Sequence, residues 1–120
     1  MKDPFYKSVK YALEGIGICI KKERNFRIHL VMMMAVIICG IFFGINKIEW
    51  MICLILFALV ISLEMVNTSI EAIVDLYTPQ FHPLAKIAKD TAAGAVLVSA
   101  IFSAIIGLMI FVPKLLLFFE

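Results

Sequence analysis

Residues 50–75 read WMICLILFALVISLEMVNTSIEAIVD, an apolar run with carboxylates inside it. The first fourteen residues of the run carry no charge, and Glu64 and Glu71 then follow seven residues apart. An ionised group at hydrocarbon depth costs about 3 kcal/mol or more, so a membrane helix that retains one generally uses it. At about 3.6 residues per turn, this spacing places both carboxylates on one helix face, together with Asn67 and Asp75. This polar face is the strongest functional feature of the sequence.

The composition predicts an integral membrane protein. The chain has 120 residues, of which 63% are hydrophobic, and its mean hydropathy of +1.05 is too high for a soluble domain of this size. Two further uncharged runs occur, and the 21 residues of the second, 92–112, are enough to cross a core of about 30 Å. We predict one all-α domain over residues 1–120, with membrane spans at 28–46, 49–75 and 91–112 and a cytoplasmic loop at 76–90.

The segment before the first span predicts an amphipathic surface helix over residues 5–22. Its apolar residues recur at steps of three and four, and lysines lie opposite them. Such a helix lies in the membrane interface or packs on the protein's own spans, and the sequence leaves both possibilities open. Residues 23–27, ERNFR, are predicted to form a polar hinge between this helix and the first span.

The basic residues predict the topology. Nine of the eleven Lys and Arg residues lie before the first span or in the 76–90 loop. The positive-inside bias therefore places the N-terminus and this loop in the cytoplasm, and the net charge of +2 gives no indication of nucleic-acid binding. With Trp50 at the outer interface and a rise of about 1.5 Å per residue, Glu64 lies about 21 Å deeper and Glu71 about 31 Å away.

This placement allows a water-soluble reagent to meet a lipid, which fits phosphoryl transfer. That reaction needs a metal, a cation and a base or positioning group. Glu23 and Glu71 can supply oxygen ligands for Mg²⁺, Lys89 can supply the cation, and Glu64 can serve as the base. The residues alone leave two alternatives equally open, a buried polar network that holds helices together and a relay that moves ions or protons.

Residues 64–75, EMVNTSIEAIVD, resemble the signature of the small prokaryotic integral-membrane diacylglycerol kinase family. The later Ala88-Lys89-Asp90 resembles the second block of the family, and the segment around Glu23 resembles its hinge. The resemblance implies a homotrimer with active sites shared between neighbouring subunits. It also implies Mg²⁺-dependent transfer of the ATP γ-phosphate to a lipid hydroxyl, in the bacterial cytoplasmic membrane.

The resemblance also implies roles for individual residues. Glu64 matches the catalytic base and contacts the acceptor lipid, and Asn67 matches a position that supports the acceptor site. Glu23 and Glu71 match the metal-binding carboxylates. The positions that match nucleotide-binding residues are Tyr11, Glu23, Glu71, Asp75, His82, Lys89 and Asp90.

Two short sequence segments indicate to which branch of the family the chain is more similar. ERNFRIH at 23–29 and AAGAV at 92–96 resemble the Gram-positive branch, whose members phosphorylate undecaprenol. His29 stands where a glutamate is usual in the Gram-negative branch, and its role is open. We therefore expect an undecaprenol kinase. A diacylglycerol kinase is the alternative within the family, and a structural or ion-conducting membrane subunit is the alternative outside it.

Overall fold

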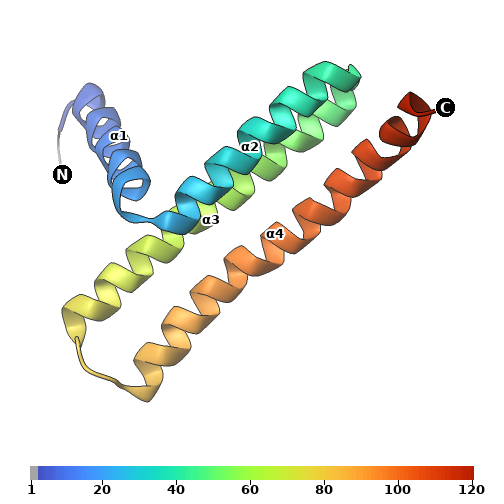
Figure 1. Cartoon of the computed structure of the whole chain (residues 1–120). Coiled ribbons are helices and arrows are strands. Elements are labelled where there is room, and N and C mark those ends of the chain that lie inside the picture. The colour runs from blue at the N-terminus through green and yellow to red at the C-terminus, as the bar shows by residue number, and fades with distance from the viewer. Residues whose placement is uncertain (1–2) are drawn as a thin grey trace.

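The computed structural model describes residues 3–120 and consists of helices joined by short links (Figure 1). The helices are α1 (Phe5–Lys22), α2 (Arg24–Phe43), α3 (Lys47–Tyr77) and α4 (Pro83–Phe118). α2 and α3 run side by side in opposite directions, α4 packs along α3, and α1 projects at an angle from the start of α2 (Figure 1).

Three of the helices, α2, α3 and α4, are long and apolar enough to cross a membrane. Within the most apolar 18-residue stretch of each helix, only 11% of the residues of α2 are buried inside the chain, and only 17% of those of α3 and of α4. Apolar surface on this scale requires lipid or neighbouring subunits around it. The predicted fold class, an all-α integral membrane protein with three spans and an N-terminal helix, is confirmed.

α3 and α4 are longer than the hydrocarbon core. Their 31 and 36 residues give lengths of about 46 and 54 Å, against about 30 Å for the core. Each of these two helices therefore extends beyond the hydrocarbon core at one or both of its ends. α4 also continues through Pro113 to Phe118, past the predicted end of the third span at residue 112.

The link between α2 and α3 is closed by local hydrogen bonds. Gly44 ends α2 with a φ of +65°, a conformation that glycine adopts without steric cost. The Glu49 N–H donates to Asn46 Oδ1 at 2.9 Å, and the Asn46 N–H donates to Glu49 Oε1 at 3.0 Å. Lys114 Nζ lies 3.1 Å from the same Glu49 oxygen and so joins the start of α3 to the end of α4.

One buried cluster sits near this end of the molecule. Ile45, Cys53 and Ile110 form a buried cluster, and the Trp50 side chain packs against it. Gly40 of α2 lies under the Trp50 ring, where a Cβ atom would come within 2.7 Å of the ring carbon Cη2. The absence of a side chain at Gly40 therefore lets α2 and α3 approach closely around Trp50.

The turn between α1 and α2 is tighter than predicted. We expected a polar hinge over residues 23–27, but among these residues only Glu23 lies outside a helix. The reason is a side-chain cap: Arg27 Nη1 donates to the backbone oxygens of Ile20 and Lys21, each at 3.0 Å. This satisfies carbonyls in the last turn of α1, which would otherwise lack partners.

The link between α3 and α4 is also shorter than the predicted 76–90 loop. α4 begins at Pro83, so the link spans residues 78–82. His82 Nδ1 accepts a hydrogen bond from the Leu84 N–H at 3.1 Å, and proline is favoured in the first turn of a helix. The charged residues Lys86, Lys89 and Asp90 therefore lie on the first turns of α4, as a helix start near Leu84 would place them.

The apolar stripe of α1 is largely exposed. Phe5 is 83% exposed and Leu13 62%, whereas Cys19 near the C-terminal end of α1 is buried. Packing of the stripe on the chain's own spans is thus confined to that end. The remainder of the stripe favours a membrane interface or a neighbouring subunit.

Candidate active site

Glu64 lies on α3 and is 4% exposed. Its Oε1 atom is 3.2 Å from Nε2 of His29 on α2. One turn along α3, Thr68 Oγ1 donates to the Glu64 backbone oxygen at 3.1 Å. The carboxylate is therefore held between two helices with a single side-chain partner among residues 3–120.

One and two turns further along α3 are Asn67 and Glu71. Asn67 Nδ2 donates to Glu71 Oε1 at 3.2 Å, as expected for residues four apart on one helix face. The Asn67 Oδ1 atom is buried and has no hydrogen-bond partner within the described part of the chain. Because an unpaired buried acceptor costs about 1–3 kcal/mol, this atom can be stabilised by a donor from outside the chain, such as a ligand hydroxyl.

Glu23 lies at the junction of α1 and α2 and is half-buried. Glu23 and Glu71 lie near enough for their charges to influence the Glu64 carboxyl. Residues 3–120 contain no group of three or more His, Cys, Asp or Glu side chains that could enclose a metal ion. Two carboxylates nevertheless fit Mg²⁺, because this ion commonly takes one or two protein carboxylates and completes its shell with phosphate and water oxygens.

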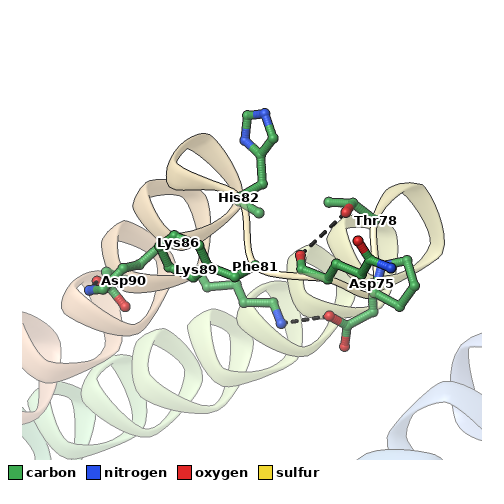
Figure 2. A pocket seen from close by; sticks show the side chains of 10 residues that line it. Asp75, Thr78, Phe81, His82, Lys86, Lys89 and Asp90 are labelled. Carbon is green, nitrogen blue, oxygen red and sulfur yellow. Dashed lines mark hydrogen bonds and ion pairs between the residues drawn. The ribbon is translucent and has the colours of Figure 1, made fainter.

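A pocket of about 340 Å³ lies between the end of α3 and the start of α4 (Figure 2). Four of the predicted nucleotide-binding residues line it, namely Asp75, His82, Lys89 and Asp90. Lys89 Nζ is 2.5 Å from Asp75 Oδ1, and Lys86 pairs with Asp90 (Figure 2). The pocket therefore presents ammonium groups whose positions are fixed by carboxylates, an arrangement that can bind phosphate.

The remaining predicted nucleotide-binding positions lie elsewhere. Tyr11 is 49% exposed on α1 and does not line the pocket. Although His82 lines the pocket, its ring caps α4 and points away from the Asp75–Lys89 pair (Figure 2). Glu71 lies on α3 between Glu64 and the pocket residue Asp75, about 10 Å along the helix from the first and about 6 Å from the second. Within one chain, the predicted residues thus form a pocket group where α3 meets α4 and a carboxylate group around Glu64, and Tyr11 lies apart from the pocket.

A second hollow, the apolar groove, has a volume of about 560 Å³. It is formed by α2, α3 and α4, and almost all of the residues that line it are apolar. His29 and Val60 line it toward the Glu64 level, and Phe43, Phe111 and Leu115 line it toward the opposite end. The groove therefore extends from the partner of Glu64 along the membrane-spanning part of the chain.

Comparison with known proteins identifies the family. The family model described as prokaryotic diacylglycerol kinase matches residues 10–111. This chain belongs to that family. As a lipid kinase it is a phosphotransferase, so the predicted enzyme class is confirmed over the structural and ion-conducting alternatives.

The relatives of this lipid kinase carry two kinds of name. The chain is 52% identical to the undecaprenol kinase of Bacillus subtilis over 111 residues, which cover 92% of this chain and 90% of the relative. It is 42% identical to a diacylglycerol kinase of Synechocystis over 91% of this chain and 63% of the relative. It is 27% identical to the diacylglycerol kinase of Escherichia coli over 82% and 81% of the two chains.

The Lys86–Asp90 and His29–Glu64 contacts of the lipid kinase were not predicted from its sequence. The Lys86–Asp90 pair follows the spacing of four that joins residues on one helix face, so this spacing could have identified it. The His29–Glu64 contact joins residues 35 positions apart on different helices, and no local pattern indicates it. Only the packing of α2 against α3 brings the two side chains together.

Proposed function

We propose that this chain transfers the γ-phosphate of ATP to the hydroxyl of undecaprenol, with Mg²⁺, at the cytoplasmic face of the bacterial cytoplasmic membrane. The observation that carries the proposal is the placement of a buried Glu64 beside His29, which lines the end of an apolar groove, on the same helix that supplies Asp75 to the polar pocket. The 52% identity to an undecaprenol kinase supports this acceptor.

The proposed reaction uses Glu64 as the base. Its carboxylate accepts the proton of the lipid hydroxyl while the hydroxyl oxygen forms a bond to the γ-phosphorus. The bond from that phosphorus to the bridging oxygen of ADP breaks, and ADP leaves with the electron pair. Asn67 Oδ1, which has no donor among the described residues, is available to bind the acceptor beside Glu64.

The nucleotide is bound on the solvent side of Glu64. Glu23 and Glu71 would hold Mg²⁺, which would neutralise charge on the ATP phosphates. Lys89 contacts the phosphates, and Asp75 fixes the position of its ammonium group through the 2.5 Å contact. Asp90 holds Lys86 at the same pocket, and His82 and Tyr11 contact the remainder of the nucleotide.

The assembly is proposed to be a homotrimer with the N-terminus in the cytoplasm. Extensive exposed apolar surface on α2, α3 and α4 supports the association of copies in the membrane. The separation of Tyr11 from the polar pocket within one chain supports a site completed by a neighbouring subunit. The basic residues of α1 and of the start of α4 support the orientation, because such residues remain on the cytoplasmic side.

Diacylglycerol is the second candidate acceptor, which the 42% identical diacylglycerol kinase of Synechocystis favours. The two candidates are separated by purifying the full chain in detergent and supplying labelled ATP with undecaprenol and dioleoylglycerol in parallel mixed micelles. We expect Mg²⁺-dependent labelling of undecaprenol well above dioleoylglycerol. The reverse preference would reassign the acceptor, and labelling of neither lipid by folded protein would contradict the proposed function.

A further inference from the structure

Only one of the two oxygens of the Glu64 carboxylate has a side-chain partner among residues 3–120. His29 Nε2 lies 3.2 Å from Glu64 Oε1, and no other side chain in residues 3–120 forms a hydrogen bond or ion pair with this carboxylate. The side chains are 21% and 5% exposed, so water cannot readily replace the contact at Glu64. One carboxylate oxygen is thus fixed by a ring nitrogen, and Oε2 has no partner among these residues.

His29 also contacts the apolar groove. It is one of the groove's few polar residues and lies at the end nearest Glu64, whereas Glu64 itself does not line the groove. A lipid hydroxyl that reaches the carboxylate from the groove therefore passes beside the imidazole. A side chain at this position can influence the carboxylate and the approaching hydroxyl together.

From this geometry we propose that His29 is a positioning residue for the catalytic base. Its Nε2–H donates to Glu64 Oε1 and so directs Oε2 toward the acceptor hydroxyl at the end of the groove. His29 keeps this proton throughout the reaction, and the proton of the lipid hydroxyl goes to Glu64 Oε2. The inference rests on the proposed function, because Glu64 must be the base for its orientation to matter.

The first test is kinetic and uses His29→Leu, which removes the donor, and His29→Gln, which retains an N–H. We expect kcat of His29→Leu to fall about 10- to 100-fold, the range for loss of a hydrogen bond to a charged group, with KM for Mg²⁺·ATP unchanged. His29→Gln should recover most of the loss. Val31→Leu, on the exposed side of α2, is the matched control and should behave as wild type.

A double-mutant cycle separates positioning from general support of the fold. If His29 acts through Glu64, adding His29→Leu to Glu64→Gln should lower kcat no further, because the group to be oriented is already disabled. A structural role would lower kcat additively. Wild-type turnover by His29→Leu, failure of Gln to recover activity, or an additive cycle would each overturn the positioning role.

A spectroscopic test does not depend on turnover. The chain has two histidines, so His82→Gln leaves the imidazole ¹⁵N signals of His29 alone in the nitrogen NMR spectrum. In this background Glu64→Leu should shift the Nε2 signal, whereas Ser62→Ala, at an exposed position of α3, should not. If the chemical shift of His29 Nε2 did not change in Glu64→Leu, the His29–Glu64 contact would be disproved, even if His29→Leu failed to fold.

The two proposals fail differently. If the wild-type chain phosphorylates undecaprenol while His29→Leu matches it, the positioning role is wrong and the proposed function stands. If the wild-type chain phosphorylates neither lipid while the Nε2 signal responds to Glu64→Leu, the contact exists but both the proposed function and the positioning role are wrong.

Discussion

Replacement of Gly40 by alanine tests the packing that brings α2 against α3. The new Cβ would lie 2.7 and 2.9 Å from two carbons of the Trp50 ring and 3.1 Å from Ile45 Cδ1. Ordinary van der Waals contacts begin near 3.4 Å, so the rigid ring must retreat by about 0.7 Å. Ile45 is 6% exposed and Trp50 packs against the buried cluster, so neither has free space to enter.

The expected magnitude follows from two opposing effects. Overpacking of this kind costs about 1–3 kcal/mol, and replacing glycine by alanine within a helix returns about 0.8–1 kcal/mol. We therefore expect Gly40→Ala to lower the free energy of unfolding by up to about 2 kcal/mol, and to be about 1–3 kcal/mol less stable than a glycine-to-alanine change at an uncrowded helix position. Gly107→Ala is the control, because its Cβ would meet no atom within 4 Å, and it should be neutral or slightly stabilising.

The assay is unfolding of the purified protein from mixed micelles by increasing SDS, followed by tryptophan fluorescence from the single Trp50. A Gly40→Ala protein as stable as Gly107→Ala, or more stable, would refute the close approach of the two helices.

Other substitutions test the catalytic groups. Glu64→Gln keeps the size of the side chain but removes the base, so kcat should fall by about 10²-fold or more while the SDS unfolding midpoint stays near that of wild type. Glu71→Gln removes a proposed Mg²⁺ ligand, so the Mg²⁺ concentration needed for half-maximal activity should rise, and an unchanged requirement would contradict that role. Asp75→Asn releases the Lys89 ammonium group at an exposed site, so KM for ATP should rise about tenfold without a change in unfolding midpoint. An unchanged KM for ATP would exclude the pair from nucleotide binding.

The three spans and the polar face of α3 could be predicted because they depend on local patterns. Uncharged apolar runs of sufficient length identify membrane helices, and the seven-residue spacing of Glu64 and Glu71 places them on one face of α3. The Asn67–Glu71 hydrogen bond obeys the same local geometry.

Contacts between helices could not be predicted in this way. The His29–Glu64 and Asp75–Lys89 pairs depend on how α2 and α4 pack against α3, which periodicity within one helix does not determine. The tight turn at Glu23 likewise depends on the reach of Arg27 back to the end of α1. A run of polar residues there indicated a longer hinge because their side-chain partners were not evident from the sequence.

The central claim is that Glu64 acts on a lipid hydroxyl when phosphate is transferred from ATP. The most direct measurement is the initial rate of labelled phosphate transfer from ATP to undecaprenol by wild-type and Glu64→Gln proteins, purified in the same detergent and matched for fold by circular dichroism. We expect Mg²⁺-dependent labelling by the wild type and a rate at least about 10²-fold lower for Glu64→Gln. Comparable rates for the two proteins would contradict a role for Glu64 as the base.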